Sequence, residues 1–455
     1  MHLRRTTVLA ASLALALAAG PLAAPVFAAE GTAGGCERGG GLAAEGRTAK
    51  AEGRGTRALD ARIPEAQAPT PQHPYAQAPH AQAPYAQAPH AQAPYAQAPH
   101  AQAPTPQHPA FQAPDPKALR DAISGLPDAT ATAALVRVGG TAGSWQGASG
   151  VRDVESGAPA DPDARFRAGS TTKVVTAATV LRLAAEGKVD LGAPVQRYLP
   201  GLLSREFQPI SIRQLLNHTS GIRPGAELGD TFEEQYAHRF ETLTPRQVVA
   251  SAVAEGPEFC PGTGQHYSNI GYTILGLLIE KVTGRSYASV ATRLVLAPAG
   301  MRHTYFPGTD PRIIGPHNHG YQAVRRADGT TDLVDVTEWN QADRAAAGDM
   351  ISTTADLERL ITSLFQGRIV PRPQLEEMFT VPSDIPGATY SAGLQRGEFD
   401  GKVFWLKTGS RPGFIAVAGA TRDLSRTLVY SINATDAKGT ELNAVAQRVV
   451  GAAVR

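Results

Sequence analysis

The chain has 455 residues, of which 42% are hydrophobic and 18% are charged, and its formal net charge at pH 7 is +2. This length allows two or three domains. The near-neutral charge gives no reason to expect nucleic acid as a partner.

The first 28 residues predict a secretory signal peptide. Arg4 and Arg5 form a positive start, residues 8–19 an apolar run, and residues 26–28 a plausible cleavage site. The run is too short to span a bilayer comfortably, and no other stretch of the sequence is long enough. We therefore expect a secreted or cell-wall-associated protein without stable membrane insertion. An uncleaved N-terminal anchor is the alternative.

Residues 29–115 predict a disordered linker rich in Pro, Ala and Gln. From Ala66 to about Pro114 the chain repeats Ala-Gln-Ala-Pro followed by Tyr or His. Proline blocks helix formation, and the other residues supply too little apolar bulk for a core, so the segment should be an extended spacer. Its histidines could bind a transition metal and its tyrosines could stack on wall polymer, but a duplicated linker is the simpler interpretation.

The chain has two cysteines, Cys36 and Cys260. An oxidising compartment permits a disulfide without requiring one. Because a bridge would tether the predicted linker to the folded part, we expect two unpaired thiols.

Residues 116–455 predict one folded domain, long enough to bury a large core. Runs of apolar residues indicate strands near both of its ends. The expected strands are 132–138, 145–152, 403–406, 414–420 and 428–432. A single sheet would thus be assembled from segments that lie far apart in the chain.

Most of the sequence between those strands has apolar residues at helical spacing. One helix should follow Ser170 and end at Gly187, another should cover residues 271–282, and residues 444–454 should form a final amphipathic helix. The fold class is therefore α/β: an antiparallel sheet flanked by helices, plus a mainly helical lobe. We expect the active site in the groove between sheet and lobe.

Ser170 and Lys173 form the first candidate catalytic pair. A serine hydroxyl barely ionises at neutral pH and needs a nearby base. Residues three apart on a helix share a face, so the Lys173 amine should lie over the Ser170 oxygen. Burial and cations such as Lys407 would lower the pKa of this amine and let it act as the base. A serine that merely caps a helix before a surface lysine is the alternative.

Tyr267 and Asn269 lie after a turn-rich run and before the second predicted helix. A phenol held among ammonium groups could lose its proton, accept one from Ser170 and return it to the leaving group. The Asn269 amide offers a donor and an acceptor, which suits the orientation of Lys173 and of a substrate amide. A tyrosine that only stabilises a loop is the alternative.

Lys407 follows a strand-like run and should end an edge strand that faces the cleft. Its positive charge suits a substrate carboxylate, and Thr408 and Ser410 should contact the substrate. Gly409 would let a substrate backbone approach closely and pair with the strand. The backbone amides of Ser410 and Ser170 would form an oxyanion hole. A solvated lysine before a turn glycine is the alternative.

Other catalytic plans are weaker. No G-x-S-x-G motif occurs, which disfavours an α/β-hydrolase. His317, His319 and Asp310 could be imagined as metal ligands, but the sequence has no H-E-x-x-H motif, so we expect no metal. His218 should organise a loop at a helix end, and the role of His266 stays open.

The three motifs, S-x-x-K at Ser170, Y-S-N at Tyr267 and K-T-G at Lys407, resemble in type and order those of the serine penicillin-recognising hydrolases. This family includes serine DD-carboxypeptidases and class C β-lactamases, and the likeness is nearest to the secreted actinomycete D-alanyl-D-alanine carboxypeptidases. The resemblance covers the chain from about residue 132 to its end. It implies a β-lactamase/transpeptidase-like fold and no metal or organic cofactor.

The resemblance also implies a penicillin-sensitive reaction. Ser170 would attack the carbonyl between two D-alanines of a peptidoglycan stem peptide, and water or an amine would resolve the acyl-enzyme. Arg396 would help to hold the terminal carboxylate, and Trp339 would line the cleft. We expect peptidoglycan peptides or β-lactams as partners, and a monomer. A class C-like β-lactamase, an esterase or amidase, and a non-enzymatic penicillin-binding sensor or wall module are the alternatives.

Overall fold

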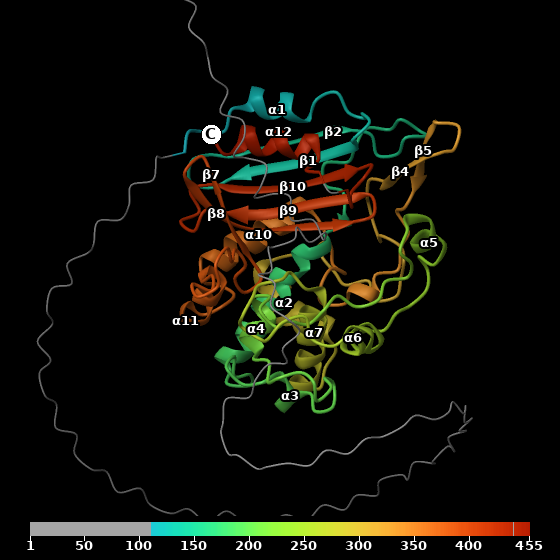
Figure 1. The fold of residues 1–455 in the computed structure, drawn as a ribbon. Helices are drawn as coiled ribbons and strands as arrows, with labels where there is room; N and C mark the ends of the chain where they lie inside the picture. Colours follow the sequence, from blue (N-terminus) through green and yellow to red (C-terminus); the bar gives the residue numbers. More distant parts are fainter. Residues whose placement is uncertain (1–110, 440) are drawn as a thin grey trace, which may run out of the picture. The chain divides into compact units, whose positions relative to one another are not determined.

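The computed structural model describes residues 111–439 and 441–455 (Figure 1). The predicted signal peptide, nearly all of the predicted linker, and Cys36 lie outside these residues. Among the helices of the described part, none combines the length and the apolar character that crossing a membrane requires.

A six-stranded antiparallel sheet forms the centre of the fold, in the order β2-β1-β10-β9-β8-β7 (Figure 1). Its strands are β1 (Ala131–Gly139), β2 (Trp145–Gly150), β7 (Gln395–Phe399), β8 (Lys402–Arg411), β9 (Phe414–Ala420) and β10 (Thr427–Ala434). The two ends of the domain meet at β1 and β10, where Val136 lies opposite Tyr430. Nearly all residues of these two strands are buried, which explains their continuous apolar runs.

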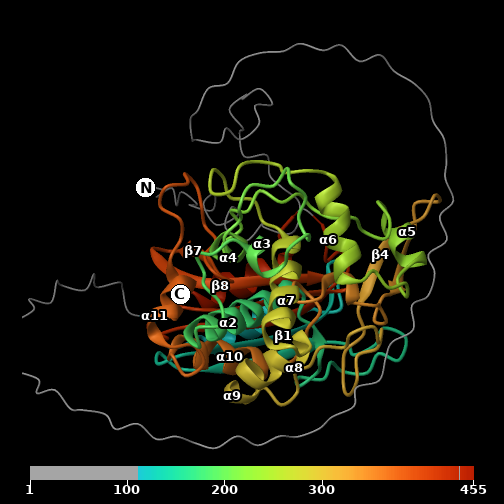
Figure 2. The same ribbon diagram turned by 90° about the horizontal axis from the view of Figure 1, so that it is seen from below.

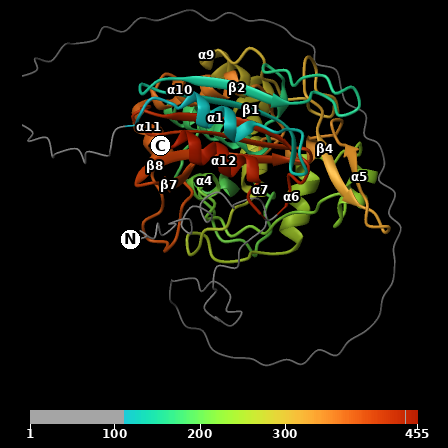
Figure 3. The same ribbon diagram turned by 90° about the horizontal axis from the view of Figure 1, so that it is seen from above.

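Two helices cover one face of the sheet. α1 (Pro116–Ile123) and α12 (Ala444–Ala453) lie side by side on it (Figure 3). Leu119 of α1 and Val450 of α12 belong to the same buried cluster as Val136 of the sheet. The amphipathic helix predicted at the C-terminus is therefore confirmed.

The opposite face of the sheet carries α10 (Thr354–Phe365) and the helical lobe. At the centre of the lobe, α2 (Thr172–Ala185) packs against α7 (Asn269–Thr283) (Figure 2). α7 ends at Gly284, whose φ of +65° is in the left-handed region that glycine adopts without strain. The predicted second helix is thus present and starts two residues earlier than expected.

Shorter elements complete the described part of the domain. The helices are α3 (Val195–Tyr198), α4 (Ile212–Leu216), α5 (Phe232–Ala237), α6 (Pro245–Ala254), α8 (Tyr287–Ala291), α9 (Ala297–Ala299) and α11 (Arg372–Leu375), with a π-helical turn at Thr292–Leu296 and 3-10 turns at Gly169–Thr171, Ala342–Arg344 and Glu376–Phe379. β3 (Phe166–Arg167) pairs with β6 (Ile351–Ser352), and β4 (Tyr321–Arg325) pairs with β5 (Thr331–Asp335). The predicted fold class, an antiparallel sheet flanked by helices plus a mainly helical lobe, is confirmed.

Cys260 differs from its prediction. It is half-buried in a turn, where the Thr263 amide donates to the Cys260 carbonyl oxygen at 3.0 Å, and its sulfur is disulfide-bonded. The prediction of an unpaired thiol at this position is wrong.

Candidate active site

Ser170 lies in the 3-10 turn Gly169–Thr171, which leads directly into α2. Gly169 has a φ of +53°, and a Cβ atom placed on it would lie 2.6 Å from the Ser410 amide nitrogen. Only a glycine therefore lets this turn lie against β8. This close approach brings the backbone around Ser170 next to the Ser410 amide, which we predicted from the sequence to be part of an oxyanion hole.

Lys173 is fully buried beneath Ser170. Its Nζ lies 3.2 Å from Ser170 Oγ, 2.7 Å from Asn269 Oδ1 and 2.6 Å from the Ala347 carbonyl oxygen. A neutral amine has two protons to donate and one lone pair, which matches donation to the two carbonyl oxygens and acceptance from the serine hydroxyl. This geometry suits a general base.

The charge state of Lys173 follows from its surroundings. Burial is the main cause that holds its pKa well below the usual range, and the positive charges of Lys407, Arg344 and Lys438 act in the same direction. The shift favours the neutral amine, which is the form that can take the proton from Ser170.

Tyr267 lies close to the side-chain nitrogens of two lysines. Lys173 Nζ is 4.9 Å and Lys407 Nζ is 4.8 Å from the centre of its ring. Burial raises the pKa of Tyr267, although the nearby Ser170 hydroxyl opposes the rise, and Oη makes no well-formed hydrogen bond within residues 111–439 and 441–455. The expectation that the phenol readily loses its proton is therefore not supported, because burial favours the neutral phenol over the phenolate. At rest, Tyr267 is a proton donor.

His218 supports the loop that carries Tyr267. Its backbone has a φ of +63°, its Nδ1 accepts from the Ser268 amide at 3.1 Å, and its ring lies 4.7 Å from that of Tyr267. Burial, followed by the charges of Lys173 and Lys407, holds the pKa of His218 well below its usual range. A neutral ring that accepts a backbone hydrogen bond organises the loop and carries no charge into the site.

The end of β8 brings Lys407, Thr408 and Ser410 to the same place. Lys407 is buried, and its Nζ donates to the Thr408 carbonyl oxygen at 2.8 Å. Burial lowers the pKa of Lys407 to about 7. Its positive charge is therefore present below neutral pH and is lost above it.

Gly409 has a role beyond the one expected. A Cβ atom at this position would lie 2.0 Å from the Ala168 carbonyl oxygen and 3.0 Å from the Ser170 amide nitrogen. The missing side chain is needed for contact between β8 and the turn that carries Ser170. The protein's own backbone occupies the side of the missing Cβ atom, and the pairing of a substrate backbone with this strand stays a prediction.

One pocket contains most of the predicted site. Its lining includes the predicted residues Ser170, Tyr267, Asn269, Lys407, Thr408, Gly409 and Ser410. It also includes residues that the sequence analysis missed, among them Arg344, Arg411, Lys438, Glu441 and Asn443. Lys438 could have been found: β8, β9 and β10 form an antiparallel meander, so β8 and β10 end at the same edge of the sheet.

Two predicted substrate residues lie elsewhere. Arg396 is on β7, half-exposed and 3.3 Å from Glu398, and it is not part of the pocket lining. The prediction that it holds a substrate carboxylate is therefore corrected. Trp339 is buried and lines a smaller pocket, which shares Arg344, Arg411 and Lys438 with the main one. It can influence an extension of the cleft but does not line the space beside Ser170.

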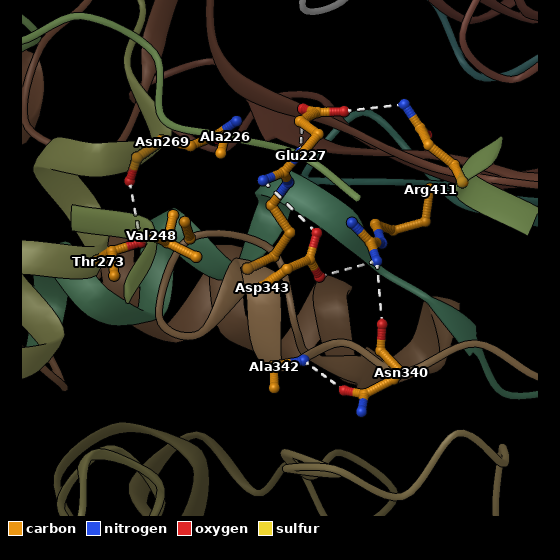
Figure 4. A network of polar contacts seen from close by, with 12 residues as sticks. Ala226, Glu227, Val248, Asn269, Thr273, Asn340, Ala342, Asp343 and Arg411 are labelled. Atoms are coloured by element: carbon orange, nitrogen blue, oxygen red, sulfur yellow. Dashed lines mark hydrogen bonds and ion pairs between the residues drawn. The ribbon is translucent and has the colours of Figure 1, made fainter. Parts of the chain in front are cut away.

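A charged network borders both pockets (Figure 4). Asp343 accepts from Arg411 at 3.2 Å and lies 3.5 Å from Arg344, which also pairs with Glu227. Burial opposes ionisation of Asp343, but Arg411 and Arg344 hold its pKa below the usual range. Figure 4 shows the Asp343 carboxylate facing Arg411, which also donates to the Asn340 carbonyl oxygen.

The histidines considered as metal ligands do not converge on one point. His319 Nδ1 pairs with Asp335 at 2.7 Å, His317 Nδ1 lies 2.7 Å from the Gly315 carbonyl oxygen, and Asp310 pairs with Arg312. His266, whose role was open, pairs with Glu258 at 2.7 Å. Across the described residues, no group of three or more His, Cys, Asp or Glu side chains could hold a metal ion.

Comparison with known proteins identifies the family. The model of the beta-lactamase family matches residues 119–452. The chain belongs to the beta-lactamase family. Its fold is of the β-lactamase/transpeptidase type, as expected, and the chain is a serine hydrolase of this family with Ser170 at the base of the pocket.

Solved structures agree with this assignment. A D-stereospecific amidohydrolase from Streptomyces sp. is 33% identical, covers 74% of this chain and 98% of its own, and superposes with a TM-score of 0.64. A D-amino acid amidase from Ochrobactrum anthropi SV3 is 26% identical with a TM-score of 0.63, and the match covers 74% of this chain and 98% of that one. The octameric penicillin-binding protein homologue from Pyrococcus abyssi, 24% identical with a TM-score of 0.58, shares the fold over 67% of this chain and 70% of its own. The expectation of a monomer stays a prediction.

Curated relatives show the same range of chemistry. Penicillin-binding protein 4* of Bacillus subtilis is 28% identical over 60% of this chain and 62% of its own length. Esterase EstB of Burkholderia gladioli is 33% identical over 41% of this chain and 50% of its own length. The matched region thus spans only about half of the curated relatives it resembles.

Proposed function

We propose that the protein is an exported serine D-alanyl-D-alanine carboxypeptidase that trims peptidoglycan stem peptides through an acyl-enzyme on Ser170. The observation that carries the proposal is the hydrogen-bonding of Lys173, whose Nζ faces Ser170 Oγ and two carbonyl oxygens. A buried neutral amine at this position activates the serine. The likeness to penicillin-binding and D-stereospecific relatives supports a substrate of D configuration.

Acylation begins when Ser170 Oγ attacks the carbonyl carbon of the scissile amide and its proton moves to Lys173 Nζ. The backbone amides of Ser170 and Ser410 stabilise the negative charge that develops on the carbonyl oxygen. Tyr267 gives its proton to the leaving amine and recovers one from Lys173. The C–N bond breaks, the D-amino acid leaves, and an ester to Ser170 remains.

Deacylation uses the same groups in reverse. Water attacks the ester carbonyl, its proton passes to the neutral Lys173 directly or through Tyr267, and Ser170 Oγ regains a proton as it leaves. The rate of this step distinguishes a peptide substrate from a β-lactam inhibitor, because a bulky β-lactam fragment left on Ser170 blocks the approach of water. We propose that β-lactams inhibit the enzyme in this way.

The charges of the pocket favour a substrate with a free carboxylate. Lys407, Arg344, Arg411 and Lys438 line it, against Asp343 and Glu227 in the bordering network and the exposed Glu441. This positive excess suits a peptide that ends in a carboxylate.

Export is proposed on the N-terminal sequence pattern, which lies outside the described residues. The disulfide of Cys260 supports it, since disulfides persist in oxidising compartments. The predicted association with the cell wall is part of the same proposal.

A D-amino-acid amidase is the second candidate. Its support is the amidohydrolase from Streptomyces sp., which this chain covers over 98% of its length. Such an enzyme would cleave amides that lack a terminal carboxylate.

One set of assays separates the candidates. The purified protein would receive acetyl-D-Ala-D-Ala, the same peptide as its C-terminal amide, D-phenylalanine amide and nitrocefin. The proposal expects fastest release of D-alanine from the free acid, slow nitrocefin turnover, and a stable benzylpenicillin adduct on Ser170 by mass spectrometry. Preference for either amide would favour the amidase, and rapid nitrocefin turnover a β-lactamase. A Ser170→Ala variant that kept full turnover would overturn the mechanism.

A further inference from the structure

Lys438 is a cation without a counterion in the pocket of Ser170. It follows β10 by four residues and lines both the main pocket and the smaller one beside Trp339. Its ammonium group has no hydrogen-bond or ion-pair partner among residues 111–439 and 441–455. Lys438 is half-buried, and charged groups that are partly shielded from water are normally paired. An unpaired one in a cleft points to an anion supplied by a ligand.

The fold fixes the position of Lys438 relative to the catalytic strand. β8 and β10 flank β9 and run in the same direction, so they end at one edge of the sheet. Ser410 Oγ at the end of β8 donates to the carbonyl oxygen of Ala437. The residue before Lys438 is thereby tied to the strand end whose amide is assigned to the oxyanion hole.

The neighbouring charges do not neutralise Lys438. Arg344 and Arg411 stand beside it, and these two arginines already share the carboxylates of Asp343 and Glu227. Arg411 Nε is also buried without an acceptor in the described part of the chain. The site therefore has hydrogen-bond donors without acceptors, namely the Lys438 ammonium group and Arg411 Nε, and lacks an anion to pair with them.

Burial is the main cause that lowers the pKa of Lys438 to about 7. The charges of Arg411 and Arg344 add to the shift, while Glu227 and Asp343 oppose it. A carboxylate bound next to the ammonium group would raise this pKa again. Glu441, the acidic residue that lines the main pocket, is exposed to solvent.

We infer that Lys438, with Arg344 and Arg411 beside it, binds the C-terminal carboxylate of the substrate. This inference rests on the proposed carboxypeptidase function and names the group that gives it specificity. It also replaces Arg396, which faces solvent and Glu398 on β7. The same cation would bind the carboxylate of a released product.

The experiment compares two substrates in three variants. The selectivity ratio is kcat/KM for acetyl-D-Ala-D-Ala divided by kcat/KM for its C-terminal amide. Loss of a charge-assisted hydrogen bond should lower this ratio about 10- to 100-fold in Lys438→Met. Lys438→Arg keeps the charge and should retain most of the ratio, and Arg396→Ala should leave it at the wild-type value. An unchanged ratio in Lys438→Met, or a fall in Arg396→Ala in its place, would overturn the inference.

A second readout keeps the inference separate from the proposed function. If the wild-type protein cleaves neither peptide, the proposed function fails, and inhibition of p-nitrophenyl acetate hydrolysis then tests the site alone. N-acetyl-D-alanine should inhibit more strongly than its amide in the wild type, and Lys438→Met should abolish the difference. Equal inhibition by acid and amide in the wild type would show that no carboxylate site exists. Thermal unfolding of each variant verifies that it is folded.

Discussion

Lys173 acquires its function from the groups that surround its amine. A solvated lysine is a cation at pH 7, whereas this one is buried with positive neighbours and has two carbonyl oxygens to accept its protons. The same reasoning leaves Tyr267 protonated at rest, because burial disfavours its anion. Burial thus prepares a base and a proton donor side by side.

Replacement of Lys173 by arginine should be as damaging as replacement by alanine. A guanidinium stays charged at any accessible pH and cannot accept the proton of Ser170. We expect both variants to lose about 10²- to 10⁴-fold in the rate of acylation by benzylpenicillin, followed by mass spectrometry. Lys188→Arg, at an exposed lysine paired with Glu186, is the matched control and should acylate normally. Wild-type acylation by Lys173→Arg would contradict the assignment of the base.

The binding of carboxylate substrates should weaken as pH rises through about 7. The pKa values of Lys407 and Lys438 are both lowered to about 7, so both side chains are charged below this pH and neutral above it. KM for acetyl-D-Ala-D-Ala should therefore increase between pH 6 and 8.5, and KM for the C-terminal amide should not. A parallel change for both substrates would assign the titration to another step.

At the scale of elements, two glycines allow β8 to meet the turn that carries the nucleophile. Gly169 approaches Ser410, and Gly409 approaches Ala168 and Ser170. Each lacks a side chain because backbone occupies the place of the Cβ atom. The contact fixes the spacing between the serine and the strand of the proposed oxyanion hole.

Gly409→Ala should therefore separate β8 from the Ser170 turn. The new Cβ would lie 2.0 Å from the Ala168 carbonyl oxygen, a distance that only a shift of backbone can relieve. We expect kcat/KM to fall by about 100-fold, as oxyanion-hole losses do, together with a lower Tm. Gly451→Ala on α12, where nothing lies within 4 Å, is the control and should keep its activity and gain slightly in stability. Full activity of Gly409→Ala would show that the contact is not needed.

The sequence predicts the elements that are buried on both faces or carry a motif. β1, β9 and β10 have continuous apolar runs because helices and lobe cover both faces of the sheet. β7 was missed, because its five residues alternate between buried and exposed and half of the pattern is polar.

The order of the three catalytic motifs, which resembles that of a known family, predicted that they lie together. The residue that binds the substrate carboxylate was not predicted in the same way. Distance along the chain suggested Arg396, whereas strand register puts it opposite Trp405, two residues before Lys407 and away from the pocket. Arg344 ends the 3-10 turn Ala342–Arg344, and Lys438 follows β10. Their approach depends on tertiary contacts that no local sequence pattern predicts. The register of β7 on β8 and the meander from β8 to β10 determine which cationic side chains reach the pocket.

At the scale of the whole molecule, a buried carboxyl makes stability depend on pH. Asp349 is buried and accepts from the Ala346 amide at 3.2 Å, and burial raises its pKa to about 7. Because the pKa is higher in the folded than in the unfolded state, its contribution to stability is complete below about pH 4 and is lost as pH rises through 7. The pKa of Asp349 differs by about three units between the folded and the unfolded state, which corresponds to at most about 4 kcal/mol of free energy of unfolding.

Asp349→Asn should remove this dependence. An amide oxygen can accept the same backbone hydrogen bond without a charge to bury. The Tm of the variant should exceed that of the wild type by a few degrees at pH 8 and by much less at pH 5, measured by calorimetry. Asp163→Asn, at a carboxylate that is 81% exposed, should show no such difference. A variant that is less stable than the wild type at both pH values would show that the Asp349 charge is needed.

The pairing of β1 with β10 sets the time at which the protein can fold. Thr132 donates to the carbonyl oxygen of Asn433, 301 positions later, so the middle of the sheet joins the beginning of the domain to its last strand. During synthesis, β1 can pair early with β2, but its other side stays unpaired until residues 427–434 have left the ribosome. A chain that remains open this long can still be threaded through a translocation pore, and loss of a few dozen C-terminal residues removes the strand on which assembly depends.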